Sequence, residues 1–251
     1  MNRPETVVSA LLEAVRGVIT EHEVTYEEYA TAKQWLIDVG EAGEWPLFLD
    51  VFVETTVERN ASCGRAGSAG TILGPYHLPD APVLKAPFEL PRREQEPGEP
   101  LTLTGQVTDV DGTPLAGAVL DVWHADAEGL YSGFHPDVPA GILRGKVFTD
   151  ARGRYEVNTI LPAPYMIPHD GPTGAIVAAC GWHPWRPAHI HVIVGASGHE
   201  PLITQLFFED SEYLDGDVAG AVKDDLVVRP LAGRVEYDFA LAPVAVPLGV
   251  G

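Results

Sequence analysis

The sequence predicts a mainly β protein, a β-sandwich preceded by an α-helical N-terminal region. Before residue 60, apolar residues recur at three- and four-residue spacing, which is typical of amphipathic helices. After residue 100, short stretches alternate polar and apolar residues, and many of the 26 Gly and 22 Pro separate them. We therefore expect a helical region and linker over residues 1–100 and a β-sandwich domain over 101–251.

The first 60 residues carry three expected helices. Thr25 and Glu28 have the spacing of a capping box, in front of a second helix over 26–39. A third helix is expected over 46–59, although its segment VFVETTV is rich in β-branched residues and also fits a strand. The first helix has an apolar stripe made of Val7, Val8, Leu11, Leu12, Val15, Val18 and Ile19.

Short expected strands fill the chain from residue 101 onward. The first of them runs into Asp111-Gly112, a pair typical of β-hairpin turns. Many short strands with turn residues between them indicate a sandwich or a barrel. The expected strands are LTLTGQVTD, GAVLDVWHA, GRYEVNTI, AHIHVIVGA, LITQLFF and RVEYDFALA.

The charge balance excludes some partners. The chain has 36 acidic and 16 basic residues, a formal net charge of −20, which disfavours nucleic acid and anionic membrane surfaces as partners. Two cysteines without a CxxC motif disfavour a disulfide framework or a thiolate zinc site. The sequence shows neither a signal-peptide pattern nor an apolar run of about 20 residues, so we expect a cytoplasmic protein.

The segment RPAHIHVIV, residues 186–194, contains two histidines two positions apart. On a strand, His189 and His191 point to the same side with Cα atoms about 6.6 Å apart, so both imidazoles can bind one metal ion. Ile190, Val192 and Val194 then face the core. The alternative is a pair of exposed or hydrogen-bonded histidines on an edge strand.

Two tyrosines lie on loops that follow expected strands. Tyr131 ends the polar segment HADAEGLY, and Tyr165 lies between the prolines of LPAPYMIP, which hold the chain extended. A single tyrosine on a rigid loop more often serves packing than catalysis. Two such loops together with the histidine pair form a more specific pattern than any one of them.

Taken together, these motifs resemble the intradiol ring-cleaving dioxygenases, which include catechol, chlorocatechol and hydroxyquinol 1,2-dioxygenases. The resemblance implies a non-haem Fe(III) ion held by Tyr131, Tyr165, His189 and His191. The matching segments are TILGPYHLPDAP (71–82), GTPLAGAVLDVWHADAEGLYSGF (112–134), TDARGRYEVNTILPAPYMIPHDGPTG (149–174), GWHPWRPAHIHVIV (181–194) and ITQLFF with YLDGD (203–217).

The residue types suit this assignment. Two phenolates and two neutral imidazoles form a more anionic ligand set than the two-histidine, one-carboxylate triad of Fe(II) oxygenases, and therefore favour Fe(III). Bound Fe(III) in turn lowers the pKa of each tyrosine from its usual value of about 10. The resemblance implies that Tyr165 leaves the metal when substrate binds, and that O2 opens the ring between its two hydroxyl carbons to give a cis,cis-muconate.

Two further polar residues match positions beside the iron. The resemblance implies that Arg186 stabilises negative charge that develops on the ring, as a preorganised cation can. Its alternative role is a surface salt bridge, because acidic residues are plentiful. Gln205 lies in the apolar segment ITQLFF, where an inward polar side chain needs a hydrogen-bonding role.

The substrate is expected to be a small aromatic diol or triol. Asp50 can accept a hydrogen bond from a third ring hydroxyl, which favours hydroxyquinol (benzene-1,2,4-triol) converted to 3-hydroxymuconate (maleylacetate). Aspartate at this position is typical of chlorocatechol as well as hydroxyquinol members, so catechol and chlorocatechol stay alternatives, as does a solvated role for Asp50. By resemblance, the pocket wall comprises Leu47, Asp50, Val51, Ile72, Gly74, Tyr76, Val218 and Ala219.

Other interpretations differ in class. A cupin-type oxygenase also uses two histidines on a β scaffold, but it needs a glutamate a few residues later, and the next one here is Glu200. A β-sandwich binding module without metal would tolerate loss of Tyr131 or Tyr165. The resemblance also implies a homodimer through the N-terminal helices, often around a bound lipid, although the apolar stripe equally fits packing on the sheet. Trp182 departs from the basic residue expected there.

Overall fold

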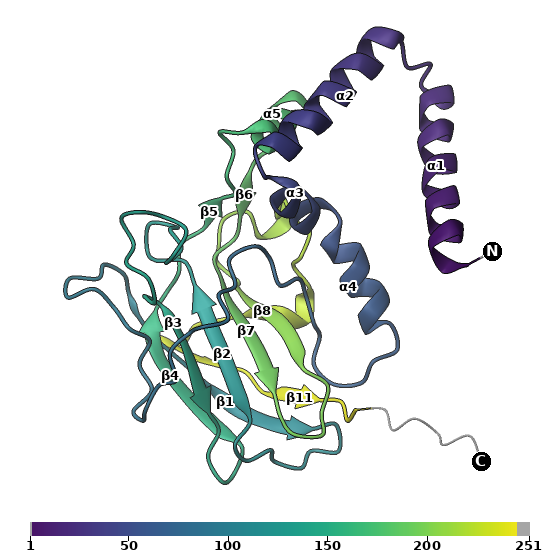
Figure 1. Cartoon of the computed structure of the whole chain (residues 1–251). Helices are drawn as coiled ribbons and strands as arrows, with labels where there is room; N and C mark the ends of the chain where they lie inside the picture. Colours follow the sequence, from purple (N-terminus) through teal and green to yellow (C-terminus); the bar gives the residue numbers. More distant parts are fainter. Residues whose placement is uncertain (1, 245–251) are drawn as a thin grey trace, which may run out of the picture. The chain divides into compact units, whose positions relative to one another are not determined.

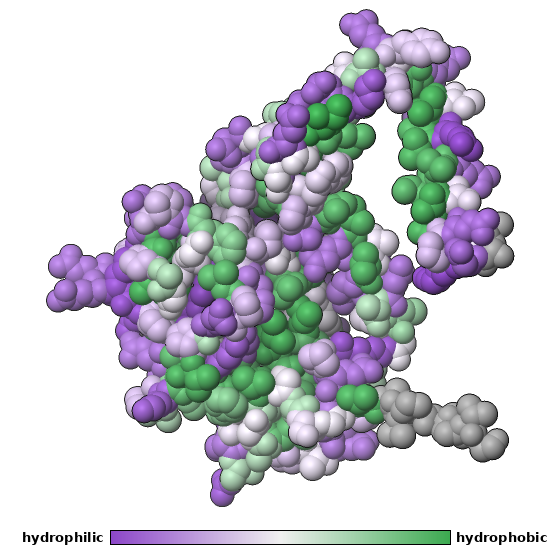
Figure 2. All heavy atoms as spheres, viewed as in Figure 1, coloured by the Kyte–Doolittle hydropathy of each residue, from purple (hydrophilic) through white to green (hydrophobic). Residues whose placement is uncertain are grey.

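The computed structural model describes residues 2–244 and divides into two compact units, Met1–Trp45 and Pro46–Gly251 (Figure 1). The first unit contains α1 (Arg3–Glu21), in which the Asn2 side chain accepts a hydrogen bond from the Glu5 N–H at 2.9 Å. Every residue of the expected apolar stripe is between 37% and 61% exposed in the single chain. Figure 2 shows these apolar side chains along one side of the helix.

The second helix, α2 (Tyr26–Glu41), has the expected capping box. The Glu28 N–H donates to the Thr25 hydroxyl at 3.2 Å, and the Thr25 N–H donates to the Glu28 carboxylate at 2.8 Å. These two bonds satisfy N–H groups that the first turn of a helix leaves free. The prediction of this helix and of its start is confirmed.

The third expected helix is in fact two helices, α3 (Trp45–Phe52) and α4 (Glu54–Ser62). The break falls at Val53, whose φ of −124° and ψ of −36° depart from helical geometry. It lies in the β-branched segment, where crowding against the preceding turn weakens helix propensity. The alternative of a strand in this segment is wrong.

Two main sheets form the β domain. The four-stranded sheet contains β1 (Pro100–Asp109), β4 (Arg154–Ile160), β10 (Arg234–Glu236) and β11 (Phe239–Leu241). The five-stranded sheet, in spatial order, consists of β3 (Arg144–Phe148), β2 (Val119–His124), β7 (His189–Gly195), β8 (Leu202–Phe208) and β9 (Val227–Val228). Shorter elements are β5 (Tyr165–Met166), β6 (Trp185–Arg186), α5 (Pro172–Ala179) and the 3₁₀ turns η1 (Leu214–Gly216) and η2 (Asp224–Leu226).

One hydrophobic core joins the two sheets and confirms the mainly β, sandwich-like fold. Fully buried aliphatic side chains converge from both, because each strand sends alternate side chains to the same face. From the four-stranded sheet these are Leu103, Val107 and Val157, and from the five-stranded sheet Leu120, Val122, Val192 and Val194.

The chain turns back on itself after β1, as the Asp111-Gly112 pair predicts, but the hairpin is short and does not pair β1 with β2. Gly112 has a φ of 84°, and the Asp109 N–H donates to the Thr113 carbonyl at 2.9 Å. A single antiparallel bridge joins Thr108 to Pro114, and the next strand, β2, belongs to the other sheet. The Leu115 N–H donates to the Val107 carbonyl at 2.9 Å, which continues the pairing one residue past Pro114.

The described helices include none that is long and apolar enough to cross a membrane. The expected division of the chain after residue 100 stays a prediction about domains. Residues 245–251 of the expected C-terminal domain lie outside the described part of the chain.

Candidate metal centre

The two histidines lie on a central strand of the five-stranded sheet. β7 pairs with β2 on one side and β8 on the other, and His189 and His191 are each only 1% exposed. The alternative of an exposed pair on an edge strand is therefore wrong. Cross-strand register places Trp123 and Gln205 beside His191, on the face opposite to the sandwich core. The Trp123 ring stacks on His191 with centroids 4.6 Å apart and an interplanar angle of 9°.

The imidazole Nε2 atoms of the two histidines point at each other across 3.1 Å. His189 Nδ1 lies 2.7 Å from the Pro187 carbonyl oxygen, which can only accept a hydrogen bond, so Nδ1 carries the proton and Nε2 presents its lone pair. His191 Nδ1 is buried and has no hydrogen-bond partner among the described residues. Two facing ring nitrogens, one of them held as an acceptor, fit a metal ion bound between them.

Tyr131 reaches this point from the loop after β2. Its hydroxyl lies 3.4 Å from His189 Nε2, and the residue is 3% exposed. The Tyr76 ring stacks on the Tyr131 ring at 4.3 Å, with an interplanar angle of 13°. Buried Arg144 fixes both backbones, because it donates to the Ser132 carbonyl at 2.7 Å and to the Tyr76 carbonyl at 2.7 Å. These hydrogen bonds hold the Tyr131 loop in place although it is not part of a β-sheet.

Tyr165 approaches from the other side, on β5. This strand pairs with β6 so that Tyr165 lies directly opposite Arg186. The Tyr165 ring is 5.2 Å from the Tyr131 ring and 5.6 Å from the His189 ring, centroid to centroid, and the residue is 5% exposed. The four side chains that the sequence predicted as ligands are thus brought together.

Arg186 is buried and fully paired, so the alternative of a surface salt bridge is wrong. Its Nε and Nη2 donate to the two carboxylate oxygens of Asp217 at 2.9 and 3.0 Å. Nη2 also donates to Gln205 Oε1 at 3.0 Å, and Nη1 lies 3.3 Å from His189 Nε2. Gln205 in turn donates to the Ile72 carbonyl at 2.8 Å, which confirms a hydrogen-bonding role for this inward amide.

Asp217 is a residue of the site that sequence reasoning missed. Besides Arg186, its carboxylate accepts from the N–H groups of Ala219 at 3.2 Å and Ala221 at 3.0 Å. A buried arginine needs a buried anion, which was the available signal. With 36 acidic residues in the chain, that signal does not say which one.

Burial sets the protonation of the four candidate ligands. It raises the pKa of the Tyr131 phenol well above 10.0 and raises that of Tyr165, although nearby Arg186 opposes both shifts. Burial lowers the pKa of His189 to about 3 and that of His191 well below 6.5. The protein alone therefore holds two neutral phenols and two neutral imidazoles. A bound trivalent cation would lower the pKa of each phenol, so the donor set fits Fe(III).

The charge of Arg186 is also fixed by its surroundings. Burial alone would lower the pKa of its guanidinium, but the Asp217 carboxylate reverses this and raises the net value. Burial likewise works to raise the pKa of Asp217, and Arg186 lowers it overall. The pair therefore stays ionised beside the phenols. Such a fixed cation can stabilise negative charge on a bound ligand.

A cavity of about 620 Å³ opens onto the two phenols, a size typical of small-molecule sites. Its lining includes Tyr76, Phe134, Met166 and Trp185 beside Tyr131 and Tyr165.

The expected pocket wall divides into two groups in the structure. Four of its residues lie against the centre: Ile72 and Ala219 through the bonds to Gln205 and Asp217, Tyr76 by stacking, and Gly74 with its Cα facing His191. Leu47 and Val51 are buried in the core of the second unit, Asp50 is half-buried on α3, and Val218 lines a separate cavity with Phe52 and Trp182. Their contact with substrate stays a prediction.

Two protein-family models match the sequence of this chain. A family model described as "Dioxygenase" matches residues 72–241, and one described as "Catechol dioxygenase N terminus" matches residues 2–68. The first of these spans the five-stranded sheet and all four candidate ligands.

Individual relatives and a solved structure match this chain over most of its length. A chlorocatechol 1,2-dioxygenase of Rhodococcus opacus is 48% identical over 218 residues, covering 85% of this chain and 84% of the relative. The crystal structure of a 3-chlorocatechol 1,2-dioxygenase from Rhodococcus opacus matches with a TM-score of 0.93 at 46% identity, over 96% of this chain and 99% of that chain. A hydroxyquinol 1,2-dioxygenase of a Rhizobium species is 36% identical, over 90% of this chain and 78% of the relative.

Proposed function

The chain belongs to the intradiol ring-cleaving dioxygenases, and from that premise we propose that it is a chlorocatechol 1,2-dioxygenase. Members of this family are non-haem Fe(III) enzymes that act on catechol-type aromatics with O2. The proposed reaction inserts both atoms of O2 and cleaves a chlorinated catechol between its hydroxyl carbons, giving a chloro-cis,cis-muconate. The observation that carries the proposed chemistry is the buried cluster of two phenols and two imidazoles.

Chlorocatechol replaces hydroxyquinol as the main substrate proposal. The chlorocatechol relative is 48% identical to this chain, against 36% for the hydroxyquinol relative. Asp50 does not separate the two substrates, because aspartate at this position fits either branch of the family. Its carboxyl is half-buried on α3, and burial raises its pKa. Hydroxyquinol is kept as the second candidate because this carboxyl can accept a bond from a third hydroxyl.

In this proposal Tyr131, Tyr165, His189 and His191 hold the Fe(III). When bound, Fe(III) supplies a Lewis acid that the two oxygens of a catechol can chelate. As a phenolate in the metal-loaded protein, Tyr165 Oη, on the strand residue opposite Arg186, would accept a proton from a substrate hydroxyl and become a neutral phenol. Arg186, oriented by Asp217 and Gln205, stabilises negative charge on the bound ring.

The colour of the iron-loaded protein and a substrate panel test this function. Charge transfer from tyrosinate to Fe(III) should give a broad visible band, and anaerobic addition of catechol should shift it. The specificity kcat/KM should be highest for 3- or 4-chlorocatechol, measured beside catechol and hydroxyquinol. A colourless protein with full iron occupancy contradicts the family chemistry. A clear preference for hydroxyquinol that Asp50→Ala abolishes would restore the second candidate.

The proposal includes a homodimer through the N-terminal helices, with a lipid bound in the interface. The exposed apolar stripe of α1 supports it, because a lone soluble helix seldom exposes so many large apolar side chains on one face. Leu11→Lys should shift the mass measured by light scattering toward that of one chain, while Glu13→Lys, also on α1, should not. Organic extraction with mass spectrometry tests for the lipid. The cytoplasmic location stays a prediction.

A further inference from the structure

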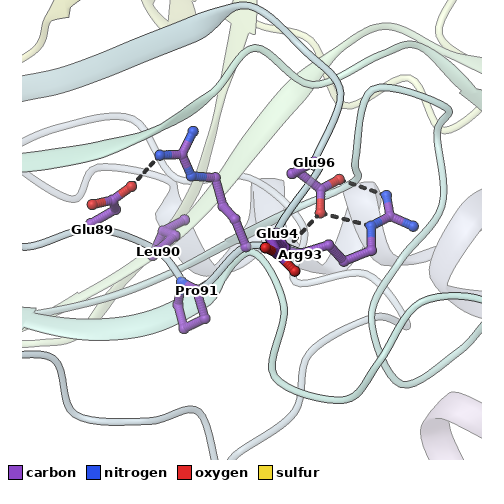
Figure 3. Close-up of a pocket in the computed structure, with 7 residues that line it drawn as sticks. Glu89, Leu90, Pro91, Arg93, Glu94 and Glu96 are labelled. Atoms are coloured by element: carbon purple, nitrogen blue, oxygen red, sulfur yellow. Dashed lines mark hydrogen bonds and ion pairs between the residues drawn. The ribbon is translucent and has the colours of Figure 1, made fainter.

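A cluster of one partly exposed arginine and two buried carboxylates, Arg93, Glu96 and Asp126, lies outside the metal centre. Arg93 Nε and Nη2 donate to the two oxygens of Glu96 at 2.8 and 2.6 Å, an interaction that Figure 3 shows beside a pocket of the surface. Arg93 Nη2 also donates to Asp126 Oδ2 at 2.8 Å. The side chain of Glu96 is 2% exposed and that of Asp126 is 0% exposed.

The other oxygen of Asp126 organises the loop that carries Tyr131. Asp126 Oδ1 accepts the backbone N–H groups of Glu128 and Leu130, both at 2.9 Å. The Asp126 N–H donates to the Leu130 carbonyl at 2.9 Å, which closes the loop one residue before Tyr131. The direction in which the chain enters Tyr131 therefore depends on where this one carboxylate is held.

The same loop also contacts the segment that carries Tyr165. The Asp126 carbonyl accepts the Ala163 N–H at 3.2 Å. Gly129 in this loop has a φ of +83°, and a Cβ placed there would lie 2.9 Å from Tyr165 Cβ. A displacement of the Asp126 loop would therefore move both phenols, because Tyr131 follows this loop directly and the Tyr165 segment packs on it.

Arg93 is the cation that keeps the Asp126 carboxylate in place. Two buried carboxylates share its guanidinium, and without it Asp126 would be a buried anion with no ion-pair partner in the described structure. The planar fork of arginine serves both carboxylates at once, which the single ammonium of lysine cannot do with the same geometry. The neighbouring Arg92 pairs with half-exposed Glu89 and makes no described contact with Asp126.

We propose that Arg93 is a positioning residue for the metal centre, which acts through Asp126 to set the places of the Tyr131 and Tyr165 phenols. This inference rests on the proposed function, since it assigns the two phenols to Fe(III). The inference assigns a role to a charged cluster whose three residues are not among those that line the cavity beside Tyr131 and Tyr165.

The test compares Arg93→Met with Arg92→Met, a matched loss of charge at the next residue of the same pocket. Fe(III) affinity is measured by competition with a chelator, and the tyrosinate band is recorded by visible and resonance Raman spectroscopy at full iron loading. Arg93→Met should weaken iron binding about 10- to 100-fold, the range typical of residues that orient metal ligands, and should shift the band. Arg92→Met should stay within about twofold of the wild type, because its ion pair is partly exposed.

Two further variants keep the test decisive if Arg93→Met does not fold. Asp126→Asn retains an oxygen for the Glu128 and Leu130 N–H groups and loses the acceptor for Arg93, so it should reproduce the spectral shift. Arg93→Lys should have an Fe(III) affinity and a band position between those of the wild type and Arg93→Met. Unchanged iron affinity and an unchanged band in these variants, even with lower thermal stability, would overturn the proposal. A wild type without any tyrosinate band would instead contradict the proposed function.

Discussion

At the scale of single residues, the hydrogen bond between His189 Nδ1 and the Pro187 carbonyl sets the chemical form of one candidate ligand. It fixes the neutral tautomer and turns Nε2 toward His191 and Tyr131. Burial lowers the pKa of His189 to about 3, so protonation does not compete for this nitrogen near neutral pH. His189 is thus held in the neutral form, with Nε2 free to bind a metal ion, whereas Tyr131 and Tyr165 must each lose a proton to do so.

Replacing Tyr165 by phenylalanine tests its assigned role. We expect Tyr165→Phe to change the visible band and to lower kcat about 100-fold, the lower range for loss of a proton-transfer group. Stopped-flow absorbance of the ring-opened product measures the turnover. Tyr155→Phe is the control, because Tyr155 is also buried but bonds the Tyr237 carbonyl and stacks on Phe239 in the other sheet. Unchanged turnover in Tyr165→Phe would refute its role.

His124 should make stability depend on pH. This buried side chain bonds the Ala125 carbonyl and the Thr159 hydroxyl, and burial lowers its pKa from 6.5 to about 4. The unfolded chain therefore takes up the proton first, so stability is full above pH 6.5 and falls as the pH drops toward 4.

The His124 contribution amounts to about 2 kcal/mol between pH 7.5 and pH 5. Urea unfolding of the metal-free protein at the two pH values measures it. The wild type should lose about that much more free energy of unfolding than His124→Gln. Equal losses would show that His124 does not carry this pH dependence.

The four candidate ligands could be selected from sequence, whereas the residues that hold them in place could not. His189 and His191 share a strand, and each tyrosine lies in a distinctive loop, so pattern and resemblance sufficed. Asp217 and Asp126 act through contacts with Arg186 and Arg93, which are 31 and 33 residues away along the chain. Such pairings depend on the folded topology, and no local pattern marks them.

At the scale of elements, β1 is the strand on which two C-terminal strands meet. Thr102–Thr104 pairs in parallel with β10, and Val107–Asp109 pairs in parallel with β11. Gly105 lies at the change of partner, where a Cβ would come within 1.9 Å of the Tyr237 carbonyl oxygen. The chain passes from β10 to β11 through a space that only glycine leaves open.

Gly105→Ala should therefore destabilise the protein by about 1–3 kcal/mol, the usual cost of overpacking, because backbone must move to admit the methyl group. Chemical unfolding measures the loss. Gly195→Ala in β7 is the control, since its Cβ would meet only Val119 Cγ1 at 3.5 Å, an ordinary contact. A Gly105→Ala variant as stable as the control would contradict the close approach at Tyr237.

Five longer strands were predictable, the expected strand RVEYDFALA is divided into β10 and β11, and the two-residue strands were not predictable. β1, β2, β4, β7 and β8 each have at least six residues with apolar periodicity, which is enough for a pattern. β5, β6 and β9 have two residues each and exist only because a partner strand lies alongside. The helix α5 was missed because its eight residues are too few for a periodic pattern.

At the scale of the whole molecule, the net charge of −20 opposes folding by self-repulsion. Raising ionic strength from about 0.01 M to about 0.15 M shortens the Debye length from about 30 Å to about 8 Å. The same salt weakens exposed ion pairs such as Arg234 with Glu156, but each contributes only about 0–1 kcal/mol. Screening of the net-charge repulsion should therefore have a larger effect on stability than screening of these ion pairs.

Salt should therefore stabilise the chain. We expect the Tm to rise by about 2–4 °C over this range, which corresponds to about 1 kcal/mol. Scanning calorimetry in NaCl measures the change, with sucrose of equal osmolality as the uncharged control. A Tm that falls with added NaCl would mean that the attractive pairs outweigh the net charge.

The sequence positions of the donors and of the expected wall have a consequence for how such enzymes diversify. All four donors lie within residues 131–191, whereas six of the eight expected wall residues lie within 47–76. That stretch is held together internally, because the Glu54 carboxylate accepts the N–H groups of Leu73 and Gly74. Substitutions within 47–76 should therefore change which ring the enzyme prefers without removing any of the four candidate ligands.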